Sequence, residues 1–146
     1  MYMKKGFICQ NCGYLIPITR VMGTRHRNQC PQCLWSKHVD LKSPGDRKST
    51  CLGLMEPIGL TFKEEGMDKY GKPRQGEIMI IHLCHGCQKL SINRIAADDD
   101  SKAILAIFEK SLALPDELKE RIKNEGTKLL KEKDREEIRT QLLGRK

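Results

Sequence analysis

The sequence contains three cysteine pairs, in each of which two residues separate the cysteines. The pairs are Cys9 with Cys12, Cys30 with Cys33, and Cys84 with Cys87; a seventh cysteine, Cys51, stands apart. An odd number of cysteines in such close pairs, with no apolar segment at the start of the chain, argues against a secreted disulfide framework. We therefore expect reduced thiols in a cytoplasmic protein. No membrane span is expected, since no stretch approaches about 18 apolar residues.

The first two pairs have the spacing of a tetrahedral zinc site. A Cys-x-x-Cys turn places two sulfurs on one side of the backbone, and two such turns enclose the metal. Seventeen residues separate Cys12 from Cys30, within the window of about 15–20 residues for this pattern. Only 5% of the residues are aromatic, so a metal would compensate for a small hydrophobic core. We predict zinc on Cys9, Cys12, Cys30 and Cys33, with rubredoxin-like iron or a redox dithiol as the alternatives.

The remaining cysteines predict a second site at the end of a β-hairpin. Two extended runs, Leu52–Lys63 and Glu77–Cys84, flank a connection rich in glycine and lysine over Glu64–Gly76. Antiparallel pairing of these runs would bring Cys51 to the third cysteine pair. The second zinc would then have three thiolate ligands and need a fourth.

Histidine is the expected fourth ligand. The predicted ligands of the second zinc are Cys51, Cys84, Cys87 and His38. His82 is the alternative to His38, because it lies two residues before Cys84 and thus on the same strand face. Two other interpretations stay open: Cys51 as a buried apolar side chain, and a different pairing of the three knuckles.

The chain becomes helical after Asp98. Apolar residues recur at helical spacing over Ser101–Leu112, and the preceding acids are placed to cap that helix. A second helix is predicted from Pro115 to Glu125, and a third from Thr127. The third would carry Leu129, Leu130, Ile138, Leu142 and Leu143. The expected fold is α+β: a zinc-ribbon-like small β domain with paired cysteine knuckles over residues 1–100, and a helical C-terminal extension over residues 101–146.

Several spaced motifs are similar to those of one family. They are Arg-Asn-Gln-Cys-Pro at Arg27–Pro31, Pro-Gly-Asp-Arg at Pro44–Arg47, Met55-x-Pro57-Ile58, His82-x-Cys84-x-x-Cys87 and Asn93-Arg94. Over about residues 7–100 the chain resembles the RNHCP domain family, and the resemblance implies zinc binding. The family name spells Arg-Asn-His-Cys-Pro, whereas this chain has Gln29 in place of the histidine. The resemblance therefore supplies no histidine ligand or base at this position.

The positive charge is concentrated near the first cysteine pairs. The net charge is +8, and residues 1–60 hold nine lysines and arginines against three acids. Such a surface favours an anionic partner. The residues predicted to bind nucleic acid are Arg25, Arg27, Lys37, Arg47 and Lys48. The alternative is that some of them compensate the negative charge of zinc thiolates. Trp35 also has two possible roles: its ring could stack on an unpaired base, or it could cover a metal site.

The expected function is that of a zinc-stabilised protein with two zinc ions that binds RNA or a ribonucleoprotein such as the ribosome. The choice of the ribosome as the example rests on analogy with other small basic zinc proteins. A protein-interaction adaptor that uses residues 101–146 is the alternative. A zinc-dependent hydrolase or nuclease ranks third, because thiolate-rich zinc is usually structural. We do not expect an enzyme.

Overall fold

The computed structural model describes residues 7–9, 11–16, 30, 32–37, 51, 53–64, 66–72, 76–95 and 99–144. In these ranges strands precede helices along the chain, which confirms the predicted α+β class. No helix in this part of the chain is long and apolar enough to span a membrane.

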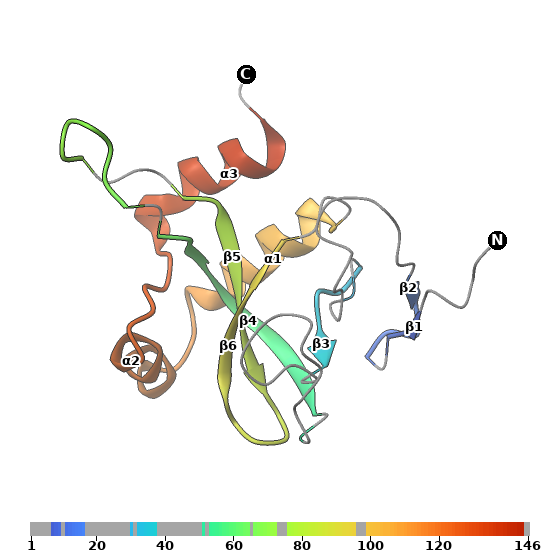
Figure 1. Cartoon of the computed structure of the whole chain (residues 1–146). Helices are drawn as coiled ribbons and strands as arrows, with labels where there is room; N and C mark the ends of the chain where they lie inside the picture. The colour runs from blue at the N-terminus through green and yellow to red at the C-terminus, as the bar shows by residue number, and fades with distance from the viewer. Residues whose placement is uncertain are drawn as a thin grey trace.

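An antiparallel sheet forms the centre of the molecule (Figure 1). Its strands, in spatial order, are β3 (Ser36–Lys37), β4 (Leu54–Phe62), β5 (Ile78–Cys84) and β6 (Leu90–Arg94). The β4–β5 pairing confirms the hairpin predicted from the two extended runs. A separate two-stranded sheet pairs β1 (Phe7–Ile8) with β2 (Leu15–Ile16) around the first cysteine pair.

Strand β6 was not predicted from the sequence. It is short, it carries polar residues such as Ser91 and Asn93, and it follows the third cysteine pair directly. The turn at that pair folds the chain back so that β6 pairs with β5, from Leu83↔Leu90 to Met79↔Arg94. A turn made by cysteines thus produces a hairpin whose second strand has a weak pattern of its own.

The first two predicted helices are present. Helix α1 (Ser101–Ser111) begins after Asp100, whose side chain accepts a hydrogen bond of 3.0 Å from the Lys102 N–H, as the capping prediction required. Helix α2 (Asp116–Asn124) follows Pro115 and ends shortly before Gly126, which has a φ of 82°.

The predicted start of the third helix is wrong. A short 3-10 helix, η2 (Glu132–Asp134), and helix α3 (Arg135–Leu143) replace a helix from Thr127. The Leu130 N–H instead donates a hydrogen bond of 2.9 Å to the Leu60 carbonyl of β4. This contact with the sheet holds the segment before η2 in a non-helical conformation, because its backbone is bonded to another strand.

The helices bury both faces of the sheet. On one face, α1, α3 and Leu130 pack with β4 and β5 in a cluster that includes Leu60, Ile80 and Phe108. On the other, α2 packs through Ile122 against Ile58 and Ile81. Strand β5 is covered on both faces, as its continuous apolar run predicted. The helical segment therefore shares its core with the sheet.

Candidate metal centres

The three cysteine pairs form three turns with the same hydrogen bonds. In each, the first cysteine's N–H donates to the carbonyl five residues later, and its carbonyl accepts from the N–H four residues later. These bonds measure 2.8–2.9 Å at Cys9, Cys30 and Cys84. The N–H two residues after the first cysteine points to its sulfur, at 3.3–3.4 Å. An N–H directed at sulfur stabilises a thiolate, so each turn is built to present a negatively charged ligand.

The residue after each second cysteine has a positive φ. Gly13 has a φ of 79°, Leu34 of 64° and Gln88 of 65°. Leucine and glutamine adopt this conformation at a cost, and glycine does not. Because the same conformation recurs at all three turns, the knuckle imposes it on the chain.

The first centre brings together the four predicted cysteines. The Sγ atoms of Cys9 and Cys33 lie 3.6 Å apart, and those of Cys12 and Cys30 lie 3.7 Å apart. A tetrahedron of sulfurs about 2.3 Å from a zinc ion has edges of about 3.8 Å, whereas a disulfide requires about 2.05 Å. All four Sγ atoms lie within 4.8 Å of one another. This donor set and its spacing fit a tetrahedral thiophilic metal.

The electrostatics of these thiols differ with their surroundings. Burial raises the pKa of Cys30 well above its usual value. Burial acts in the same direction on Cys9, but hydrogen bonds led by the Cys12 and Asn11 N–H groups outweigh it and lower the pKa. Four thiolates this close repel one another, so full deprotonation of the cluster requires a bound cation.

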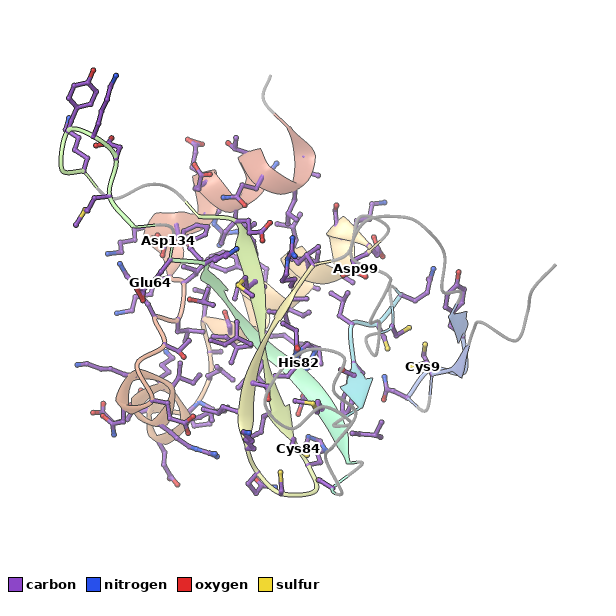
Figure 2. All side chains as sticks on the ribbon, viewed as in Figure 1. Cys9, Glu64, His82, Cys84, Asp99 and Asp134 are labelled. Atoms are coloured by element: carbon purple, nitrogen blue, oxygen red, sulfur yellow. The ribbon has the colours of Figure 1, made fainter. Side chains whose placement is uncertain are left out.

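The second centre lies at the end of the β4–β5 hairpin. Met55 pairs with Cys84 across the two strands, which places Cys51, just before β4, beside the third knuckle. The Sγ atoms of Cys51 and Cys84 lie 3.5 Å apart, and Cys87 completes a group within 4.8 Å. A Cβ at Gly86 would lie 2.8 Å from the Cys51 sulfur, so only glycine fits there. Figure 2 shows Cys9 and Cys84 well separated, so the two centres are distinct.

The structure decides the role of one of the two histidines that were predicted as the fourth ligand. His82 is fully buried, with Nε2 2.7 Å from the Leu34 carbonyl oxygen and Nδ1 2.8 Å from the Asn93 amide nitrogen. Both ring nitrogens are therefore occupied, and burial lowers the pKa of His82 to about 4, so the ring is neutral near pH 7. His82 is not a ligand of the cysteine group. His38, the favoured ligand, lies outside the described residues.

Trp35 and His85 lie at the third knuckle. Their rings meet edge to face with centroids 5.3 Å apart, and His85 Nε2 lies 2.9 Å from Glu56 Oε1. Trp35 thus lies against the loop between two cysteine ligands. This contact favours the interpretation of Trp35 as a cover for the metal site.

The predicted nucleic-acid-binding residues lie almost entirely outside the described part of the chain. Arg25, Arg27, Arg47 and Lys48 are not among the described residues, and of Lys37 only the backbone, in β3, is described. Their role stays a prediction.

Sequence reasoning missed three residues that shape the surroundings of the two centres. They are Gly86, which makes room for the Cys51 sulfur, and the pair of Asn93 and Leu34, which hold His82. A glycine inside a Cys-x-x-Cys turn was a usable signal for close packing of sulfurs. The His82 contacts join residues 48 and 11 positions apart in the chain, and no local pattern indicates them.

A family model confirms the resemblance that the motifs indicated. No curated protein and no solved structure matches the chain. The match to the family covers residues 4–105 and ends inside α1, so most of the helical segment lies beyond it. The division at residue 100 stays a prediction. With six cysteines in three equivalent knuckles and a match over more than half of its length, the chain belongs to the RNHCP domain family.

Proposed function

We propose that the protein binds two zinc ions and that the folded, zinc-loaded protein binds RNA. The observation that carries the metal proposal is the convergence of three equivalent knuckles into two thiol groups with sulfur–sulfur distances of 3.5–3.7 Å. Thiols are the ligands that zinc prefers in structural sites. Zinc would supply a cross-link here between residues far apart in the chain, since 18 positions separate Cys12 from Cys30 and 33 separate Cys51 from Cys84.

The ligand assignment is specific for each centre. Cys9, Cys12, Cys30 and Cys33 would hold the first zinc. Cys51, Cys84 and Cys87 would hold the second, with His38 as the fourth ligand. Such thiolate-rich sites stabilise folds and do not activate water, so we propose a binding protein and not an enzyme.

Elemental analysis of the reduced protein tests the metal proposal. We expect two zinc ions per chain, and about one in Cys51→Ser, with the first centre still loaded. His38→Ala should also lose the second zinc, whereas His82→Ala should retain it, because His82 contacts no cysteine sulfur. A wild-type value of one zinc would overturn the second site.

RNA is proposed as the partner because of charge. Residues 1–60 hold nine lysines and arginines against three acids, around the cysteines of the first centre. Cations close in sequence to a zinc site suit the phosphate backbone of RNA. A ribonucleoprotein in the cytoplasm, such as the ribosome, is the setting that we propose.

The packing of the helices argues against the adaptor alternative. Ile104, Phe108 and Ile138 are fully buried against the chain's own sheet. These core-facing residues of α1 and α3 are therefore engaged within the chain, although Leu143 at the end of α3 is 55% exposed.

Salt-dependent binding tests the RNA proposal. About four to six phosphate contacts imply a slope of log affinity against log salt of about −3 to −4 for single-stranded RNA. Arg25→Gln, Arg27→Gln and Lys48→Gln together should reduce that slope by about two. Zinc content must be unchanged in the variant, because loss of metal would show that these residues support the metal. A zinc-loaded wild-type protein without RNA affinity at low salt would refute the proposal.

A further inference from the structure

A basic groove lies between the C-terminal half of α2 and the segment that leads to η2. Its volume is about 520 Å³. In Figure 1, α2 and this segment lie on the opposite side of the sheet from β1 and β2. The groove is therefore remote from the first metal centre. Its lining residues are Lys119, Glu120, Lys123, Gly126, Thr127, Lys128, Leu129, Lys131 and Lys133.

The lining is strongly positive. It contains five lysines and a single acid, Glu120. In the described part of the chain, no carboxylate lies within ion-pair distance of the lysine ammonium groups of the groove. Lys119 Nζ donates a hydrogen bond of 3.2 Å to the Leu112 carbonyl oxygen. The other four ammonium groups are therefore available to an external anion.

The acids near the groove have partners elsewhere. Glu125 pairs with Arg121 at 3.3 Å, and Glu132 accepts from Arg135 at 2.7 Å. Asp134 accepts a hydrogen bond of 2.9 Å from the Lys131 backbone N–H. Because arginines and a backbone donor hold these carboxylates, the positive charge of the groove is not neutralised from its rim.

The backbone beneath the lysines is fixed. Leu129 packs in the cluster on the α2 face of the sheet, and Leu130 is 1% exposed and bonded to Leu60. Lys128 and Lys131 flank this anchored pair, and both side chains are exposed. On the other wall, Ile122 is fully buried and fixes α2 beside Lys123. A fixed backbone reduces the entropy lost when the cations gather around a ligand.

The composition of the groove indicates the class of ligand. Lysine ammonium groups act as point charges that suit phosphate oxygens. The lining includes no aromatic residue, so it offers no platform on which a base could stack. We propose that this groove binds the phosphodiester backbone of RNA, independently of sequence, as a second contact surface. The identity of this polyanion rests on the proposed function, whereas the groove itself does not involve the N-terminal residues.

The test compares two triple variants of the full-length, zinc-loaded protein. The groove variant is Lys123→Gln, Lys128→Gln and Lys131→Gln. The matched control is Lys72→Gln, Lys102→Gln and Lys110→Gln, which removes the same charge from exposed positions outside the groove. Binding of a labelled single-stranded RNA of mixed sequence is measured by fluorescence anisotropy over a series of salt concentrations.

We expect the groove variant to reduce the salt slope by about two, since each lost contact accounts for about 0.7. The control should keep the wild-type slope, and both variants should keep two zinc ions and the wild-type helix content. Equal losses in the two variants would show an effect of net charge alone and would overturn the proposal. Displacement of RNA by stoichiometric inorganic tripolyphosphate, at constant ionic strength, would also overturn it in favour of a free polyphosphate.

The N-terminal variant Arg25→Gln, Arg27→Gln and Lys48→Gln separates this proposal from the proposed function. If it weakens binding and the groove variant does not, the N-terminal face stands and the groove proposal falls. If only the groove variant weakens binding, the groove stands and the N-terminal face falls. Absence of RNA binding by the wild-type protein overturns both.

Discussion

The two metal centres use the same cysteine knuckle, but they differ in the buried residues that surround it. Around the first centre, the buried cluster consists of Cys9 and Cys30, with Cys33 packed against it. At the second, Cys84 ends strand β5, whose Ile78 and Ile80 belong to the main hydrocarbon core. The first region is thus held by its sulfur cluster, whereas the second borders a core that α1 and α3 complete. The same Cys-x-x-Cys knuckle can thus form the buried core of one region and a cross-link at the edge of another.

The two regions meet at Leu34. Its backbone has the positive φ of the second knuckle, while its side chain is fully buried in the core with Leu60 and Ile80. Its carbonyl accepts from Nε2 of His82, because the Asn93 amide donates to Nδ1 and leaves the proton on Nε2. Figure 2 places His82 within the sheet, between Cys84 and the helical end of the molecule. Leu34 thus fastens the first centre to the sheet, together with the pairing of β3 and β4.

Metal removal should produce the largest difference in stability between the two regions. Structural zinc in small domains contributes about 10 kcal/mol or more to folding, and the buried cluster among the described residues around the first centre consists of cysteines. We expect a strong chelator to abolish hydrogen-exchange protection at Gly13 and Leu34, while Ile80 and Phe108 keep partial protection. NMR-detected exchange measures this residue by residue. Persistent protection at Gly13 without metal would refute the comparison.

Truncation of the core should produce the opposite pattern. Phe108 is fully buried among Leu60, Ile80 and Ile104. Phe108→Ala should cost about 3–5 kcal/mol in the free energy of unfolding, measured with denaturant, because it leaves a cavity. The first centre should keep its zinc, as shown by elemental analysis under native conditions. Loss of that zinc in the folded variant would mean that the two regions depend on one core.

Removal of the histidine contact should loosen the attachment of the first region. His82→Leu leaves the buried Leu34 carbonyl without its donor, which should cost about 1–3 kcal/mol. Exchange at Leu34 and Ser36 should increase while zinc content stays at the wild-type value. Asn93→Ala is the matched control: it removes the partner of Nδ1 and retains the bond to Leu34, so a smaller effect is expected. An equal or larger effect of Asn93→Ala would contradict this account.

The smallest effect should come from an ion pair at the helical end. Hydrogen bonding to Arg135 lowers the pKa of Glu109, and the pair joins α1 to the start of α3. A carboxyl group whose pKa is lowered on folding stabilises the folded state at pH values above its usual pKa of 4.5. This contribution is lost as the pH falls through the lowered pKa. The stability difference between wild type and Arg135→Met should therefore shrink as the pH falls below 4.5. A difference that does not vary with pH would refute this role, and exposure keeps the effect small.

Local patterns explain why much of the fold was predictable. Each knuckle is encoded within six residues, and the long apolar run of β5 indicates a strand on its own. The Asp100 cap and Gly126 mark helix ends in the same local way. These predictions needed no knowledge of which segments meet in space.

Long-range contacts explain one error, the start of the third helix, and one alternative that the sequence left open, His82 as a ligand. Leu129 and Leu130 suit a helix by sequence, but the bond from Leu130 to Leu60 decides against one. The position of His82 allowed it to be a ligand or a buried core residue, and packing against Leu34 made it the latter. In both cases a partner far along the chain determined the outcome, as is usual where propensity is weak.

The register of β4 on β5 has a kinetic consequence for metal uptake. Strand pairing itself brings Cys51 to 3.5 Å from Cys84, although 33 positions separate them in the chain. The loop there is closed before metal arrives, so zinc meets converged thiols. At the first centre no strand pairing among the described residues joins the segment of Cys12 to that of Cys30, which lies seventeen residues further on. When zinc is scarce, the sheet centre should therefore load first, and the state of the N-terminal region would report how much zinc is supplied.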